Sequence, residues 1–238
     1  MNRNILIIRD GATDFKIIKK LVSEIACYKN TEIINLKFHE IDFAKLDKAT
    51  KEYFKKARQS SDYNIFSQHA KELKGSILIL LNKVFEYYLN NFEISSKDIF
   101  ILHDDIDIKL VESKNYFKEW AHSVIFIFQL AIQEFYNEKV KEYSFENLPL
   151  ILPLLFFPST EILIIAFKNK NTNKFENERK KEAWNLKQAI YQTTNLHSLS
   201  DSDLEKYALN YIEYDSLNIV FNSLPEIRNF LIIMKSSL

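Results

Sequence analysis

Acidic residues follow two short apolar runs of the sequence, and their spacing suits metal chemistry. Asp10 comes soon after the run at residues 5–8, and Asp105 and Asp107 come after the run at residues 99–102. Two carboxylates one residue apart at a strand end suit Mg²⁺, which prefers hard oxygen ligands in octahedral geometry and keeps several waters. Asp10 on an adjacent strand would complete the cluster. The pattern therefore predicts a Mg²⁺ or Mn²⁺ site at the carboxyl ends of two strands.

Asp14 lies one helical turn beyond Asp10 and is placed to hold a second ion. Gly11 stands between them, and a backbone that turns directly under a phosphate needs a positive φ or the absence of a Cβ. The same residues also have ordinary structural interpretations, because Thr13 or Asp14 can cap a helix and residues 104–107 can form a polar turn. Two acidic clusters together with the early glycine favour the metal site over coincidence.

The composition of the chain excludes several enzyme classes. Its 238 residues contain only two glycines, Gly11 and Gly75, whereas the dinucleotide-binding fingerprint, the P-loop and the nucleophile elbow each need two or three glycines close together. The chain therefore contains none of these motifs and no P-loop ATPase of its own. The single cysteine, Cys27, allows no intrachain disulfide, and the first residues carry no signal-peptide pattern. These features predict a cytoplasmic protein.

The overall charge of the chain is neutral, with 32 basic and 32 acidic residues, and gives no global signal for nucleic-acid binding. Two local basic runs, at residues 45–58 and 168–181, can each track a phosphate backbone or form a solvated face. Several aromatic residues are predicted to lie in the core rather than to stack on bases: Trp120 with Phe117, Phe126 and Phe128, and Trp184.

Short apolar runs and helical periodicity predict the elements that position the acidic residues. The runs at residues 5–8 and 99–102 are typical of strands buried on both faces of a parallel sheet. Apolar residues at three-to-four spacing predict a helix that begins near Thr13. Residues 148–167 are nearly all apolar, but they contain three prolines and Glu161, so a strand, a turn and a second apolar element are expected rather than a membrane span. The other expected elements are a strand at 31–38, helices at 43–58, 71–91 and 115–140, a helix capped near Ser200 and a last helix from Pro225 to near Met234.

Strands that alternate with helices predict an α/β fold with a mainly parallel sheet flanked by helices. In such folds ligands bind beyond the carboxyl ends of the strands. If the strands at residues 5–8 and 99–102 are parallel neighbours, Asp10 and Asp105 emerge at the same edge of the sheet. Like charges packed so closely repel each other, so at least one carboxylate of the cluster is expected to have a raised pKa.

Three segments resemble motifs of the Toprim domain, the catalytic module of topoisomerases, primases and overcoming-lysogenization-defect nucleases. Residues 7–15, IIRDGATDF, are similar to the first motif, in which an acid and a glycine follow the first strand; that acid is usually Glu, and here it is Asp10. Residues 99–107, IFILHDDID, resemble the strand that ends in Asp-x-Asp. Residues 157–162, FPSTEI, are similar to a later segment of stand-alone members, in which a Glu, here Glu161, follows a proline-containing turn.

The resemblance implies a Toprim-like, Rossmann-like core at residues 1–167 with a helical insertion at about residues 43–92. A mobile loop and C-terminal helices at residues 168–238 are expected to pack on the same core. The implied function is that of a nuclease dependent on Mg²⁺ or Mn²⁺, which cleaves DNA or RNA as the effector of a phage-defence system beside a separate ABC-type ATPase. No membrane partner is expected, and a homo-oligomer is left open.

The resemblance also implies roles for single residues. Asp10, Asp105 and Asp107 are the catalytic residues that it implies, with Asp10 as general acid or base or as a ligand. The implied metal ligands are Asp10, Asp14, Asp105, Asp107 and Glu161.

Two other functions fit parts of the pattern. A non-catalytic Toprim-like subunit would keep the fold as a protein-binding module, with Asp10 in place of Glu marking lost activity. A glycosyltransferase of the Asp-x-Asp type would use Asp105 and Asp107 to hold a nucleotide-sugar diphosphate through Mn²⁺, but it leaves Asp10 and Gly11 without a role. Magnesium binding that depends on Asp105 separates the enzyme from the inactive module.

Overall fold

A computed structural model of the chain describes residues 3–8, 12–26, 31–36, 48–50, 52–53, 63–105, 114–157, 159–168, 177, 181, 183–193, 199–224 and 227–237. Its strands are β1 (Arg3–Ile8), β2 (Thr31–Leu36), β3 (Ile99–Asp105) and β4 (Leu150–Phe156). Its α-helices are α1 (Ala12–Ala26), α3 (Tyr63–Asn91), α4 (Lys114–Lys139), α5 (Glu161–Lys168), α7 (Ala183–Tyr191), α8 (Asp201–Tyr207), α9 (Leu217–Ser223) and α10 (Arg228–Ser237). Short 3₁₀ helices are η1 (Phe145–Asn147), η3 (Leu209–Tyr211) and η4 (Tyr214–Ser216).

The chain divides into two compact units that interleave along the sequence. The first, here the sheet unit, comprises Met1–Asp10, Asn30–Asp104 and Trp120–Pro153. The second, here the helical unit, comprises Gly11–Lys29, Asp105–Glu119 and Leu154–Leu238. The division of the chain after residue 167, which the resemblance implies, stays a prediction.

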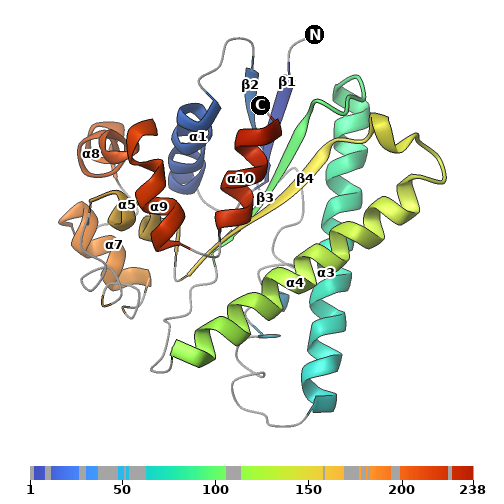
Figure 1. The fold of residues 1–238 in the computed structure, drawn as a ribbon, viewed down its shortest axis with the longest axis horizontal. Helices are drawn as coiled ribbons and strands as arrows, with labels where there is room; N and C mark the ends of the chain where they lie inside the picture. Colours follow the sequence, from blue (N-terminus) through green and yellow to red (C-terminus); the bar gives the residue numbers. More distant parts are fainter. Residues whose placement is uncertain are drawn as a thin grey trace. The chain divides into compact units, whose positions relative to one another are not determined.

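The four strands form one parallel sheet in the order β2-β1-β3-β4, so the fold is α/β and Rossmann-like (Figure 1). In the register of β1 and β3, Ile5 lies opposite Ile99 and Ile8 lies opposite Leu102. This pairing confirms the prediction that the two apolar runs are neighbouring parallel strands. Residues 5–8 are fully buried, as expected for an inner strand covered on both faces.

A buried carboxylate joins the beginnings of β1 and β3. Asp98 is fully buried, and it accepts hydrogen bonds from the backbone N of Asn4 at 2.8 Å, from Asn4 Nδ2 at 3.0 Å and from the Tyr88 hydroxyl at 2.8 Å. Burial and the neighbouring Asp98 raise the pKa of Tyr88, so its hydroxyl remains a donor. Since a buried carboxylate is costly without partners, these bonds hold the two strands in one register.

The two long helices of the sheet unit cross each other beside the sheet (Figure 1). Phe85 on α3 meets Phe135 on α4 edge to face, with ring centroids 5.5 Å apart. Tyr88 on α3 meets Phe100 on β3 in the same way at 5.1 Å. Such aromatic pairs add to the free energy gained from burial, so they fix where α3 and α4 lie against the strands.

Tyr136 on α4 ties this helix to the start of β4. Its hydroxyl donates to the Pro149 carbonyl at 2.8 Å and accepts from the Ile151 backbone N at 2.8 Å. Tyr136→Phe should lower the free energy of unfolding by about 1–3 kcal/mol, because two backbone groups lose their partner. Urea unfolding measures this change, with Tyr87→Phe on α3 as the control. A variant as stable as the parent would show that water replaces the hydroxyl.

Several sequence predictions for the helical unit are confirmed. The helix expected from Thr13 is α1, and the strand and second apolar element expected in residues 148–167 are β4 and α5. Ser200 caps α8 through a capping box, in which its side chain and that of Asp203 each accept from the other's backbone N. Within the unit, α1 contacts α10, and α5 contacts α7 and α9. The predicted helix at 43–58 lies mostly outside the described residues, although residues 48–50 and 52–53 are helical.

Two aromatic side chains predicted to lie in the core are on the surface. Phe126 is 57% exposed and Trp184 is 46% exposed. Phe128 on α4 is fully buried, which confirms the prediction for this residue, and on α7 the residues Leu186 and Ile190 form the buried face instead of Trp184. For the two exposed residues the prediction was wrong because an apolar residue count does not tell which helix face meets the core. The side chains of Phe117 and Trp120 lie outside the described part of the chain.

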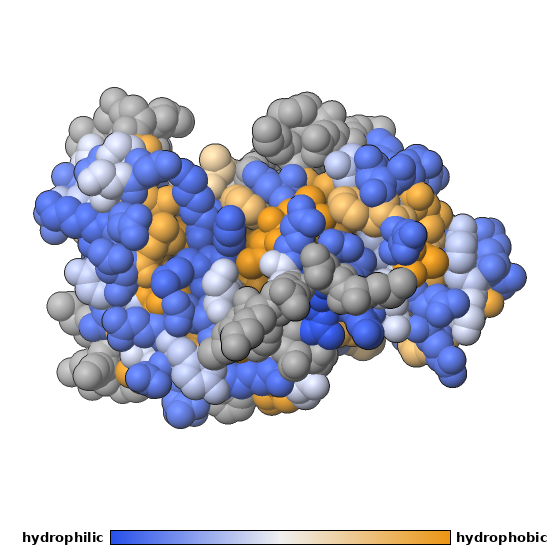
Figure 2. Space-filling view, turned by 90° about the horizontal axis from the view of Figure 1, so that it is seen from above, coloured by the Kyte–Doolittle hydropathy of each residue, from blue (hydrophilic) through white to orange (hydrophobic). Residues whose placement is uncertain are grey.

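Neither the surface drawn in Figure 2 nor the helices of the described residues indicate a membrane-spanning segment. On the face drawn in Figure 2, hydrophobic residues form separate patches between hydrophilic ones. Within the described part of the chain, no helix combines the length and the apolar character needed to cross a bilayer.

Candidate metal centre

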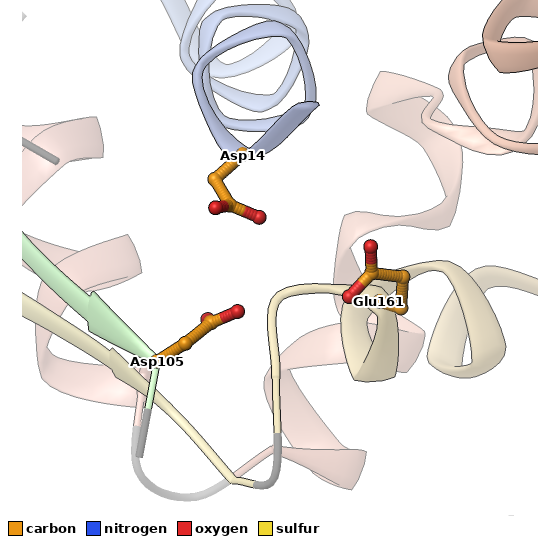
Figure 3. A group of neighbouring side chains, drawn as sticks. All are labelled: Asp14, Asp105 and Glu161. Atoms are coloured by element: carbon orange, nitrogen blue, oxygen red, sulfur yellow. The ribbon is translucent and has the colours of Figure 1, made fainter. Parts of the chain in front are cut away.

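Three carboxylates of the helical unit point toward one another (Figure 3). Asp14 comes from the first turn of α1, Asp105 is the last residue of β3, and Glu161 is the first residue of α5. One ligand oxygen from each lies within 4.8 Å of the other two. The side chains are hardly exposed, with residue exposures of 6%, 9% and 1%. Residues far apart in the sequence thus form one buried acidic cluster, here called the carboxylate cluster.

Thr160 holds Asp105 in place. Its backbone N and its Oγ1 both donate to Asp105 Oδ1, at 2.8 and 2.7 Å. Thr160 immediately precedes α5, where backbone N–H groups lack partners within the helix and favour a negative charge. These two bonds orient the carboxylate, with Oδ2 toward Lys187 at 3.8 Å.

Glu161 is the most buried member of the cluster. Ser159 Oγ donates to Glu161 Oε2 at 2.8 Å, and the Tyr191 hydroxyl donates to Oε1 at 3.3 Å. Burial raises the pKa of Glu161 to about 7; Lys187 opposes this rise, and Asp14 and Asp105 add to it. The expectation of a raised carboxylate pKa in the cluster is met at Glu161. The pKa of Tyr191 is also raised, mainly by burial and then by Glu161, so Tyr191 remains a hydrogen-bond donor.

Lys187 is the cation that faces the carboxylate cluster among the described residues. Its ammonium lies 3.6 Å from Glu161 Oε2 and 3.8 Å from Asp105 Oδ2. Among the described residues of the site, three ionised carboxylates carry a formal charge of −3, and Lys187 brings this sum to −2. Burying uncompensated negative charge is costly, so the site favours either protons or a cation.

The structure brings together three of the five predicted metal ligands. Asp14, Asp105 and Glu161 meet in the cluster, whereas Asp10 and Asp107 lie outside the described residues, as does Gly11. Most of the predicted mobile loop at 168–181 lies outside them too. The neighbouring His103 is fully buried in the sheet unit, which fits a structural role rather than contact with a phosphate.

Sequence reasoning missed Lys187 and Tyr191. These residues are four positions apart on α7, a spacing that places them on one helix face. That spacing was the available signal, but it does not reveal that α7 packs against α5. Ser159 and Thr160 belong to the segment at residues 157–162, FPSTEI. Their hydrogen bonds to Glu161 and Asp105 are known only from the folded structure.

Lys187→Met should destabilise the metal-free protein at about pH 8 by roughly 1–2 kcal/mol. The ammonium offsets two buried carboxylates, and removal of one partner of such a group leaves charge uncompensated. The value stays below that of a fully buried pair because the lysine side chain is 28% exposed. Urea unfolding in EDTA measures it, with Lys141→Met as the control. Equal stability of parent and variant would contradict the role given to Lys187.

Comparison with known proteins finds no matching family model, no matching curated protein and no matching solved structure. The fold and the site define the chain as an α/β protein with a parallel sheet and a buried acidic cluster that can hold a metal ion. The identity of such an ion follows from the chemistry of its donors.

Proposed function

We propose that this protein is a nuclease, dependent on Mg²⁺ or Mn²⁺, that cleaves phosphodiester bonds in DNA or RNA. The observation that carries the proposal is the carboxylate cluster, in which Asp14, Asp105 and Glu161 lie within 4.8 Å of one another with Lys187 beside them. The resemblance of three segments to Toprim motifs supports the same reaction. Asp10 and Asp107, which lie outside the described residues, remain ligands that the resemblance implies.

The donor set of the cluster fits a hard divalent cation. All three candidate ligands offer carboxylate oxygens, which Mg²⁺ and Mn²⁺ favour over the nitrogen and sulfur donors typical of zinc sites. Two oxygens bound directly to one Mg²⁺ lie at most about 4.2 Å apart, and the three candidate oxygens lie within 4.8 Å of one another. A divalent ion would also balance the formal charge of −2 left by the three acids and Lys187.

The chain's own residues would prepare a phosphate for attack. When bound, the metal ion would neutralise charge on the phosphate and lower the pKa of a bound water. Lys187 adds a second positive charge beside the same carboxylates, where a phosphate oxygen can meet its ammonium. Thr160 and Ser159 hold the carboxylates through hydrogen bonds, so little reorganisation is needed when charge develops.

Glu161 would couple metal binding to proton release. Its pKa of about 7 means that part of the population carries a proton on this carboxyl near neutral pH. A cation must displace that proton to bind the carboxylate. Affinity for Mg²⁺ should therefore increase as the pH rises through about 7, because the Glu161 carboxyl loses its proton over this range.

We further propose an ABC-type ATPase as partner and a role in defence against phages. This step rests on the resemblance to stand-alone Toprim-like proteins. The chain contains no P-loop, since its two glycines are far apart, so ATP hydrolysis of that kind would come from another protein. The ATPase would sense the trigger or gate the nuclease, and this chain would act as the effector that cleaves nucleic acid.

Metal binding and cleavage are tested in separate assays. Isothermal calorimetry on the purified chain should show Mn²⁺ or Mg²⁺ binding in the micromolar-to-millimolar range. Supercoiled plasmid, linear duplex, single-stranded DNA and RNA are then incubated with each metal or with EDTA, first with the chain alone and then after co-expression with the candidate ATPase. Metal binding without any cleavage would leave the metal site in place but overturn the nuclease, whereas the inactive module is expected to bind neither metal. No binding of either metal would overturn the proposal.

A further inference from the structure

One exposed face of α4 carries no charged residue between positions 126 and 140. Its members follow helical spacings of three, four and seven, which place them on one side of the helix. They are exposed except for Tyr136, which is half-buried. Val140 continues the helical spacing, since its backbone N donates to the Tyr136 carbonyl at 2.9 Å. This face, here called the neutral stripe, consists of Phe126, Gln129, Leu130, Gln133, Tyr136, Asn137 and Val140.

The charged side chains in this part of α4 lie off the neutral stripe. Glu134 forms an ion pair with Lys74 on α3 at 2.6 Å, and the Lys139 ammonium lies 5.5 Å from the centroid of the Phe85 ring on α3. Glu138 lies about 120° around the helix from the first residue of the stripe, at the usual 3.6 residues per turn. The side of a helix that faces water is normally rich in charged residues, and 27% of this chain is charged. A face without any charge therefore indicates a surface that a partner covers.

The apolar members of the neutral stripe are widely exposed. Phe126 is 57% exposed, Leu130 is 37% exposed and Val140 is 43% exposed. Phe145, which follows α4, is also exposed, and its ring centroid lies 5.7 Å from that of Tyr136. Contiguous exposed apolar surface is typical of an interaction site. All these residues belong to the sheet unit, so the surface lies within one unit.

The neutral stripe is complementary to a copy of itself that runs in the opposite direction. Residues at equal distances before and after Gln133 match in kind, because apolar or aromatic side chains match each other and amides match amides. The matched pairs are Phe126 with Val140, Gln129 with Asn137, and Leu130 with Tyr136. In two antiparallel helices that meet at Gln133, each residue lies opposite its match in the other copy. Such a self-complementary surface is what a two-fold symmetric interface requires.

We propose that the neutral stripe is the interface of a homodimer, in which α4 of two copies packs antiparallel with Gln133 at the two-fold axis. A stripe without basic side chains has nothing to attract the phosphates of a nucleic acid or an anionic membrane. Two copies of the chain do not repel each other, since its net charge is zero. The two Gln133 amides can bond to each other across the axis, and a polar residue at such a position fixes the register of paired helices. The inference is independent of the proposed nuclease.

The length of the neutral stripe sets the expected strength of the dimer. From residue 126 to residue 140 an α-helix advances about 21 Å. One helix pair of this length covers less than the roughly 800 Å² per partner of a standard interface. We therefore expect a dimer that dissociates in the micromolar range.

Sedimentation equilibrium of the full chain measures the association. The average mass should rise from that of one chain, 28.2 kDa, toward that of two as the concentration rises through the micromolar range. Leu130→Glu should raise the Kd about tenfold or more, because each copy loses a buried leucine and two like charges enter the interface. Ile232→Glu on α10, which replaces an apolar residue that is 48% exposed in the helical unit, is the matched control and should associate like the parent. Urea unfolding checks that each variant is folded.

Disulfide trapping tests the antiparallel arrangement and needs no loss of a contact. In a Cys27→Ser background, Gln133→Cys should form a covalent dimer with itself under mild oxidation, because the two copies of this position face each other at the axis. Phe126→Cys and Val140→Cys should each stay monomeric alone, since the two copies of either position lie about 21 Å apart along the helices. They should cross-link when the two variants are mixed. A non-reducing gel gives the readout.

Three results would refute the homodimer. The first is a chain that stays monomeric throughout the micromolar range, with no cross-linking of Gln133→Cys. The second is cross-linking of Phe126→Cys or Val140→Cys alone, which would contradict the antiparallel pairing. The third is a monomeric parent that binds phosphatidylcholine vesicles or another protein while Leu130→Glu does not, which would assign the neutral stripe to that partner instead. None of these results changes the proposed nuclease, which metal binding and cleavage test separately.

Discussion

Asp105→Asn is expected to abolish metal-dependent cleavage, with a loss of rate of about a thousandfold or more. Asp105 is 9% exposed, receives two hydrogen bonds from Thr160 and faces Lys187. Asparagine keeps the size of the side chain and one carbonyl acceptor for Thr160, but it removes the negative charge that a cation needs. Loss of several kcal/mol of charge stabilisation corresponds to a factor of this size.

Calorimetry and cleavage kinetics measure this effect together. Mn²⁺ binding should weaken in parallel with activity if Asp105 acts as a ligand. Asp215→Asn removes an exposed acid of the same helical unit and should leave both quantities unchanged. Full activity of Asp105→Asn would refute the metal centre, and an equal loss in Asp215→Asn would point to net charge rather than to the site.

Glu161→Gln should make the metal-free protein less sensitive to pH and more stable than the parent in alkaline solution. Glu161 is 1% exposed, and its pKa is raised from 4.5 to about 7, mainly by burial. Glutamine resembles the protonated acid, with one acceptor and one donor group, and carries no charge at any pH. The raised pKa corresponds to on the order of 3 kcal/mol as an upper value.

The direction of the pH effect follows from where the proton binds. Between pH 4.5 and about 7 the folded protein holds a proton on Glu161 that the unfolded chain has released. The resulting stability is fully present below the unfolded pKa and is lost as the pH rises through the folded pKa. The advantage of Glu161→Gln over the parent should therefore grow between acid and about pH 8.

Urea unfolding in EDTA across this pH range measures the difference, with Glu205→Gln on the exposed side of α8 as the control for charge. Mg²⁺ or Mn²⁺ should stabilise the parent at about pH 8 and should stabilise Glu161→Gln much less, since a ligand that binds only the folded state adds to its stability. Parallel pH curves for parent and variant would show that the pKa of Glu161 is the same in the folded and the unfolded state, and would contradict the raised pKa.

Much of the framework was predictable from local patterns. Continuous apolar runs at residues 5–8 and 99–102 predicted β1 and β3, and their neighbouring parallel arrangement is confirmed by the register. Three prolines and a glutamate within residues 148–167 predicted a strand and a further element, found as β4 and α5. These predictions succeeded because strand and helix formation depends on the periodicity and turn residues of a short stretch of chain.

Local sequence patterns predicted the strands β1 and β3 and the acidic residues that follow the apolar run of β3, among them Asp105. The resemblance to Toprim motifs led to the expectation that Asp14 and Glu161 share a site with Asp105, and the folded structure brings the three together. No sequence pattern showed that Lys187 faces them or that Trp184 is exposed. The physical reason is that hydrophobic burial is non-directional: an apolar pattern tells that a helix has a buried face, but not which partner covers it. Contacts such as those of α1 with α10 and of α5 with α7 and α9 depend on packing between separate segments of the chain, and no local spacing encodes them.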